Sequence, residues 1–156
     1  MSLEDITNFI EISGQLGSAG QPTRAQFSEV QVAGYQVVIN LAMPDSPGAI
    51  ADESSLVRGL GLEYIHIPVV WTAPHDQDLD AFMETMRQAR GKKVFAHCAL
   101  NMRVSSFIYI YRVVVLGAVA DEAWWDVLSV WQPDETWQNF IDQAMNRFGK
   151  SVKIQV

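Results

Sequence analysis

Three short apolar runs, rich in β-branched and aromatic residues, recur along the chain between segments with helical patterning. Runs of this kind are typical of strands that are buried on both faces. The segments between them open with cap residues or acids and close near glycine, as helices do. The pattern predicts strands at residues 36–42, 62–70 and 92–97, and helices within residues 21–35, 45–61 and 75–90.

The last third of the chain shows only helical patterning, at residues 104–116, 121–131 and 134–148. Strands that alternate with helices form a parallel sheet with helices on both faces. We therefore expect an α/β fold, a three-layer sandwich with a mostly parallel central sheet and a helical C-terminal third, in one domain spanning residues 1–156. Four tryptophans have the spacing of helix-packing residues and are assigned to the core: Trp124, Trp125, Trp131 and Trp137.

The composition restricts the possible functions. The formal net charge is −7 over 156 residues, which argues against binding to nucleic acid or to an anionic membrane, because both need basic patches. No apolar run reaches the roughly 18 residues of a membrane helix, and the acidic N-terminus lacks the basic start of a signal peptide. Cys98 is the only cysteine, and no Cys/His cluster has zinc spacing. We expect a cytoplasmic protein without a metal or other cofactor.

The segment KKVFAHCALNMRVSSF, residues 92–107, brings Cys98 to the end of a predicted strand, where ligands of such sheets bind. If the next helix starts near Val104, backbone N–H groups of the loop point inward and favour a thiolate. Arg103 adds a guanidinium that can bind two phosphate oxygens at once. These groups are what attack on a phosphate monoester requires. The predicted phosphate-binding residues are Ala99, Leu100, Asn101, Met102, Arg103, Val104 and Ser105.

Neighbouring side chains have predicted supporting roles. We expect His97 to orient the loop through backbone hydrogen bonds rather than to react itself. The hydroxyl of Ser105 or Ser106 would donate to the sulfur and ease its departure. A lone cysteine at a strand end is more often a buried thiol, but Arg103 and Ser105 favour a Cys98 that faces a ligand.

The segment HCALNMRVS resembles the signature loop of cysteine-dependent protein phosphatases, in particular the compact dual-specificity branch. Upstream, GQLGSAGQPTRAQFSEVQVAGYQVVINL is similar to the opening of bacterial dual-specificity-like phosphatases, and YIHIPV resembles the strand before their general-acid loop. The resemblance implies a dual-specificity-phosphatase-like fold. It also implies hydrolysis of phosphate monoesters without a cofactor, through a phosphocysteine on Cys98. The implied partner is a phosphate-bearing protein or small molecule.

The loop departs from the family's usual pattern in two ways. Arg103 follows Cys98 by five residues, where the family has six, and Asn101 stands where the family has a glycine. A bacterial subgroup with a similarly shortened HC-x-x-N-x-R-x-S loop is the nearest resemblance. The loop is therefore either tighter around a phosphate or altered in the way it receives one.

The general acid is the other departure. The family has an aspartate two residues after the strand end, and this chain has Trp71 there. Asp76 and Asp78 are the candidate replacements, ahead of Asp80 and His75, although acids at a helix start are also expected for capping. Trp71 itself would either flank an aromatic substrate or fill the cleft.

Two other functions are compatible with these residues. A pseudophosphatase that binds phosphate or sulfate without turnover fits the shortened loop and the missing acid. A rhodanese-type sulfurtransferase also has a strand-end cysteine with Arg or Thr five residues later, but the chain lacks that family's other signatures. Asp45 follows a predicted strand and is a further pocket candidate, whereas His66 is interpreted as a core or rim residue.

Overall fold

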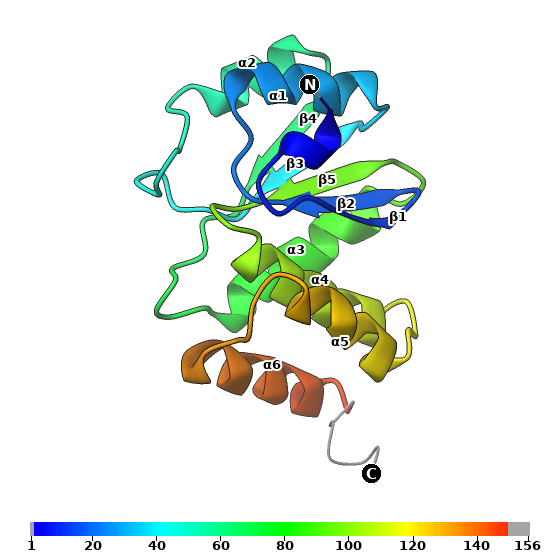
Figure 1. Ribbon diagram of the computed structural model, residues 1–156. Helices are drawn as coiled ribbons and strands as arrows, with labels where there is room; N and C mark the ends of the chain where they lie inside the picture. Colours follow the sequence, from blue (N-terminus) through cyan, green and yellow to red (C-terminus); the bar gives the residue numbers. More distant parts are fainter. Residues whose placement is uncertain (1, 150–156) are drawn as a thin grey trace.

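The computed structural model describes residues 2–149 and contains a five-stranded sheet between two groups of helices (Figure 1). The strands lie in the order β1-β2-β5-β3-β4. β1 runs antiparallel to β2, and the remaining neighbours are parallel. Their bounds are β1 (Ile10–Ser13), β2 (Leu16–Ala19), β3 (Val37–Asn40), β4 (Glu63–His66) and β5 (Val94–His97).

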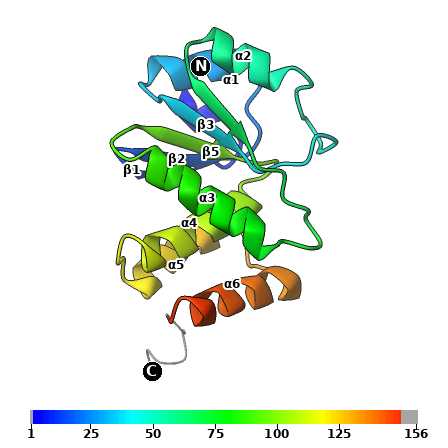
Figure 2. The ribbon, with the colours of Figure 1, turned by 180° about the vertical axis from the view of Figure 1, so that it is seen from behind.

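Helices cover both faces of the sheet, so the predicted three-layer α/β sandwich is confirmed. One face carries a short 3-10 helix, η1 (Leu3–Asp5), with α1 (Arg24–Val32) and α2 (Glu53–Gly59). The other face carries α3 (Asp76–Gln88), α4 (Met102–Val114) and α5 (Ala120–Leu128). The last helix, α6 (Glu135–Arg147), lies beyond α4 on that side, farthest from the sheet in both views (Figures 1 and 2).

The alternation of side chains along the strands produces two cores. In β3 and β5, Val38 and Phe95 point to the face covered by α1 and α2. Ile39 and Ala96, one position further, join the core under α3 to α6. Because successive strand residues point to opposite faces and both faces are covered, the first three residues of each strand are apolar, and only the last ones, Asn40 and His97, are polar. This explains the continuous apolar runs in the sequence.

The N-terminal hairpin of β1 and β2 is not predicted by the sequence pattern. β2 reads LGSA, which has no β-branched residue and contains a glycine, so it lacks the ordinary strand signal. Gly17 is required by packing, because a Cβ at this position would lie 2.4 Å from the hydroxyl oxygen of Tyr35. Since β2 pairs with β5, the hairpin makes β5 an interior strand.

Three boundaries and one burial assignment differ from expectation. β4 ends at His66 instead of continuing to residue 70, although the N–H groups of Ile67 and Val69 still donate to the carbonyl oxygens of Asn40 and Leu41. α4 begins at Met102, before Val104, so the loop after β5 is shorter than predicted. α5 ends at Leu128 rather than at residue 131. Trp125 is 71% exposed, so its assignment to the core is wrong, whereas Trp137 is fully buried.

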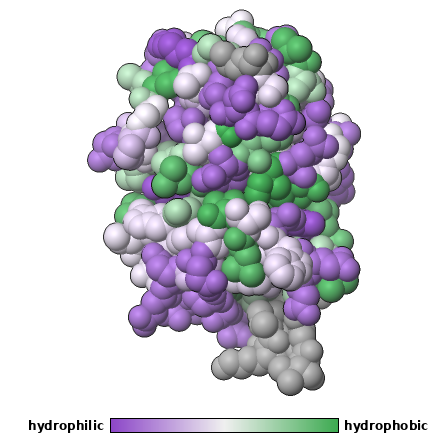
Figure 3. Space-filling view, viewed as in Figure 1, coloured by the Kyte–Doolittle hydropathy of each residue, from purple (hydrophilic) through white to green (hydrophobic). Residues whose placement is uncertain are grey.

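The surface is mixed in character. Figure 3 shows hydrophilic residues over much of one face, with hydrophobic residues in small groups between them. Within residues 2–149, no helix is long and apolar enough to cross a membrane.

Trp137 anchors α6 in the core, where its ring packs against those of Phe107 and Phe140. We expect Trp137→Ala to lower the free energy of unfolding by about 3–5 kcal/mol, because it leaves a large cavity. Trp125→Ala is the matched control and should change it by less than about 0.5 kcal/mol, because that side chain is exposed. Urea unfolding of the two variants measures both values, and equal destabilisation would contradict the assignment.

Candidate active site

A cavity of about 380 Å³ opens at the carboxyl ends of the parallel strands. Its wall combines the loops that follow β3, β4 and β5 with the first turn of α4. A larger hollow of about 590 Å³ lies at the opposite ends of β3 and β4, and Cys98 is not among the described residues that line it. The residues that line the carboxyl-end cavity are Pro47, Trp71, Cys98, Ala99, Leu100, Met102 and Arg103.

Cys98 lies at the point that the sequence predicts, directly after β5. Cys98 is 1% exposed, and its backbone N–H donates to the carbonyl oxygen of Ala19 at 3.3 Å. Because β5 is flanked by β2 and β3, the thiol is surrounded by ordered backbone on both sides. Cys98 thus occupies the floor of the cavity, at a fixed position.

The loop after β5 comprises only residues 98–101. Asn101 ends it with φ of 69°, in the left-handed region that glycine adopts most easily. Asparagine tolerates this conformation better than most residues, which explains its presence where the related loops have glycine. Its side-chain amide donates to the carbonyl of Asn8 at 2.9 Å and to the hydroxyl of Ser18 at 3.0 Å.

The carbonyl groups of this loop all bind donors behind it. His97 Nδ1 donates to Cys98 O at 3.2 Å, the N–H of Gln21 donates to Ala99 O at 3.0 Å, and Asn8 Nδ2 donates to Leu100 O at 3.0 Å. In a trans peptide the carbonyl and the following N–H point in opposite directions. The N–H groups of Ala99 and Leu100 therefore point away from these partners. Within residues 2–149 neither donates a backbone hydrogen bond, so both are available to an anion in the cavity.

Arg103 is in the first turn of α4 and is 8% exposed. Its Nε and Nη1 atoms are buried and have no hydrogen-bond acceptor in the described part of the chain. Buried polar groups are almost always paired, and an unpaired buried charge is costly. A guanidinium held in this way presents two N–H donors and a full charge to a bound oxyanion.

Trp71 supports the guanidinium from the loop after β4. The carbon Cζ of Arg103 lies 5.5 Å from the centroid of the Trp71 ring. Trp131 and Trp137 pack against the same ring at centroid distances of 5.2 Å and 5.6 Å. The indole N–H of Trp137 also donates to the carbonyl oxygen of Trp71 at 2.8 Å. These contacts hold the Trp71 ring in place as an aromatic wall of the cavity.

Glu53, the first residue of α2, is a site residue that sequence reasoning missed. Its carboxylate Oε2 lies 2.7 Å from His97 Nε2, and both side chains are buried. Gln21 Nε2 and Tyr64 Oη donate to the same carboxylate at 2.8 Å and 3.0 Å. Burial alone would raise the pKa of Glu53, but the contacts with His97, Gln21 and Tyr64 together lower it. This pair fixes the imidazole that holds the Cys98 carbonyl, as predicted for His97.

Comparison with known proteins places the chain in a family. A solved DUF442 protein from Shewanella putrefaciens, named as a candidate phosphatase, is 33% identical with a TM-score of 0.85, covering 94% of this chain and 96% of that one. The chain belongs to this DUF442 family. No family model matched the sequence. The kinase associated phosphatase, solved with serine in place of its catalytic-site cysteine, shares the fold at 12% identity and a TM-score of 0.74, covering 88% of this chain and 89% of that one.

A curated relative is the beta-lactamase hydrolase-like protein of Agrobacterium fabrum, 37% identical over 116 residues. The match covers 72% of this chain but only 25% of that protein. The DUF442 chain thus corresponds to about a quarter of the length of the curated relatives that it matches.

The residues predicted as candidate general acids in this DUF442 chain do not line the cavity. Asp76 and Asp78 open α3, where Asp78 Oδ2 accepts from the N–H of His75 at 3.2 Å. Asp80 pairs with Arg147 at 3.0 Å. None of these side chains is part of the cavity lining.

Several residues predicted around the phosphate have other environments. Asp45 is exposed on the loop after β3, and it is Pro47 of that loop that lines the cavity. Ser105 and Ser106 both donate to the carbonyl oxygen of Met102, at 3.1 Å and 2.9 Å, and not to the sulfur. Val104 is buried beneath the first turn of α4.

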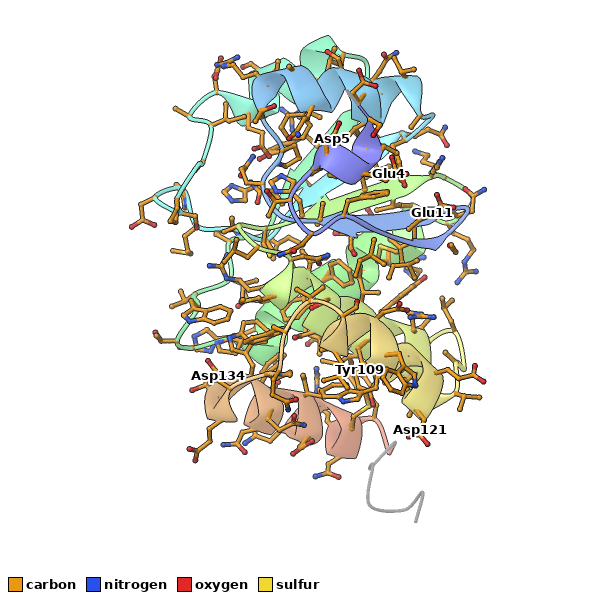
Figure 4. All side chains as sticks on the ribbon, in the orientation of Figure 1. Glu4, Asp5, Glu11, Tyr109, Asp121 and Asp134 are labelled. Carbon is orange, nitrogen blue, oxygen red and sulfur yellow. The ribbon has the colours of Figure 1, made fainter. Side chains whose placement is uncertain are left out.

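The acidic side chains labelled in Figure 4 lie away from this cavity, whereas the carboxylate of Glu53 is buried behind the loop after β5 and is bound to His97. Figure 4 shows acidic side chains on peripheral elements, and the cavity lining contains none. Glu4 and Asp5 belong to η1 and Glu11 to β1, whereas Asp121 and Asp134 lie at the starts of α5 and α6. A locally positive site is therefore compatible with a net charge of −7.

The Glu53–His97 pair makes stability depend on pH. The pKa of Glu53 is lowered from 4.5 on folding. Its contribution to the free energy of unfolding is therefore present above pH 4.5 and is lost as the pH falls through the pKa of the folded state. We expect Glu53→Gln to cost about 3–5 kcal/mol near neutral pH, because it leaves a buried pair broken. The difference from wild type should shrink below about pH 4.

Glu63→Gln is the matched control, because Glu63 pairs with Lys92 at the exposed surface. That substitution should cost at most about 1 kcal/mol. Urea unfolding between neutral and acid pH compares the two variants, and a pH-independent cost for Glu53→Gln would contradict the lowered pKa of Glu53 in the folded state.

Proposed function

We propose that this chain is a metal-independent phosphate monoester hydrolase that acts through a phosphocysteine on Cys98. The observation that carries the proposal is the guanidinium of Arg103, which is buried in the same cavity as the thiol and has no acceptor on Nε and Nη1 among residues 2–149. A bound phosphate would supply both the charge and the oxygens that this group lacks. The DUF442 family, whose solved member is named as a candidate phosphatase, supports the same reaction class.

In the proposed reaction, Arg103 and the N–H groups of Ala99 and Leu100 bind the non-bridging oxygens of the substrate. The Cys98 thiolate attacks phosphorus, and the bond between phosphorus and the leaving oxygen breaks. Water then attacks the phosphocysteine, which releases inorganic phosphate and restores the thiolate. His97 and Glu53 hold the loop in the geometry that both steps need. The proposed partner is a phosphate-bearing substrate in a reducing compartment, the cytoplasm, where the thiol persists.

Hydrolysis of p-nitrophenyl phosphate in the presence of a chelator tests this function. We expect wild-type turnover to fall to background in Cys98→Ser, because the nucleophile is lost. Arg103→Ala should lower kcat/KM by about 100-fold or more. Arg112→Ala is the matched control, because Arg112 pairs with Asp126 outside the cavity, and it should retain activity. Turnover that is equal in wild type and Cys98→Ser would contradict the proposal. If vanadate nevertheless binds in an Arg103-dependent way, the site is that of a pseudophosphatase.

A rhodanese-type sulfurtransferase is the second candidate, and the short loop favours it. Only residues 98–101 separate β5 from α4. The loop from Cys98 to Arg103 is one residue shorter than the usual phosphatase loop, so it offers a smaller ring of N–H groups to a tetrahedral phosphate. In that reaction the Cys98 thiolate takes the outer sulfur of thiosulfate as a persulfide and releases sulfite. Formation of thiocyanate from thiosulfate and cyanide, lost in Cys98→Ser, distinguishes this function from phosphate hydrolysis.

A further inference from the structure

Among residues 2–149, the wall of the cavity contains no group that can protonate a leaving oxygen. Of its seven lining residues, only Cys98 and Arg103 ionise. Cys98 is the nucleophile of the proposed reaction, and an arginine does not give up its proton in proteins. The remaining lining residues are apolar: Pro47, Trp71, Ala99, Leu100 and Met102.

Acidic and imidazole groups on the surrounding elements are engaged elsewhere or lie outside the lining. On α3, the carboxylate of Asp78 is bound to the N–H of His75, Asp80 is paired with Arg147, and Asp76 is exposed. None of them contributes to the cavity wall.

Ionisable side chains near the other parts of the cavity wall are also bound to other groups or lie outside the lining. Behind the nucleophile loop, Glu53 is committed to His97. At the end of β4, His66 Nε2 lies 2.7 Å from the carbonyl oxygen of Ala42. Asp45 is exposed and lies outside the lining.

Trp71 forms the part of the cavity wall that the loop after β4 contributes, beside Arg103. Its backbone carbonyl is bound by Trp137, and its ring is packed between Arg103 and the rings of Trp131 and Trp137. A side chain held at so many points does not move aside for a carboxyl group. The leaving group therefore departs against an aromatic surface.

We propose that this site acts on phosphoryl donors whose leaving group departs as a stable anion, namely acyl phosphates and phosphate esters of acidic phenols. The inference builds on the proposed phosphatase function. In the first step the Cys98 sulfur bonds to phosphorus, and the electron pair of the breaking P–O bond leaves on a carboxylate or phenolate oxygen without a proton. Phosphoryl transfer places much negative charge on that oxygen, so alkyl esters such as phosphoserine react poorly.

A leaving-group series tests the inference on the wild-type protein. The substrates are acetyl phosphate, 2,4-dinitrophenyl, p-nitrophenyl and phenyl phosphate, and phosphoserine, with Cys98→Ser as background. We expect kcat/KM to fall steadily as the pKa of the leaving group rises. The total fall should exceed the roughly 10²–10⁴-fold that a positioned acid would supply.

The outcomes separate the two proposals. Similar kcat/KM for dinitrophenyl and phenyl phosphate, both lost in Cys98→Ser, would overturn the leaving-group inference and leave the phosphatase intact. No Cys98-dependent hydrolysis of any substrate would overturn both.

Substitution of Trp71 provides an independent readout. Trp71→Asp introduces a proton donor, and Trp71→Asn is matched in size and loss of packing but cannot serve as an acid. We expect the aspartate variant alone to raise kcat/KM for phenyl phosphate relative to dinitrophenyl phosphate and to add an alkaline limb to the pH profile. The same response in both folded variants would contradict the position assigned to the leaving group.

Discussion

The positive charge of Arg103 is the feature on which the rest of the site depends. Arg103 is 8% exposed, and two of its guanidinium nitrogens lack acceptors in the part of the chain that the structure describes, so the group has to be held by its surroundings. Trp71 contacts its face, and the aromatic side chains of the C-terminal region hold Trp71 in turn. The helical C-terminal third therefore does more than cover the sheet, because it fixes the cation against which a ligand binds.

A second constraint acts on the nucleophile loop. Its carbonyl groups are bound by donors from β5, from the segment after β2 and from the N-terminal segment. Because these bonds are made inside the fold, the loop does not need to rearrange when an anion arrives. Such preorganisation is how proteins stabilise charge that develops during a reaction. The Glu53–His97 pair belongs to the same support and lies on the far side of the loop from the cavity.

The sequence predicts those parts of the molecule whose signals are local. Apolar runs locate β3, β4 and β5, and the position of Cys98 after β5 with Arg103 five residues later locates the cavity proposed to bind an anion. The β1–β2 hairpin is not predicted because LGSA has no local strand signal, and β2 forms a strand through its pairing with the distant β5. Glu53 escapes because its role depends on a contact across 44 residues with His97. The resemblance to phosphatases indicates an acid near Asp76 and Asp78, but the packing of Trp71 against α6 decides which side chain lines the cavity.

The bonds between Asn8 and the nucleophile loop join residues separated by 92 and 93 positions. Contacts of such high sequence separation close long chain loops and form late in folding. During synthesis, Asn8 emerges long before its partners Leu100 and Asn101. The loop around Cys98 therefore acquires these contacts only after most of the chain has been made, so the proposed anion site is a property of the completed fold and not of nascent fragments.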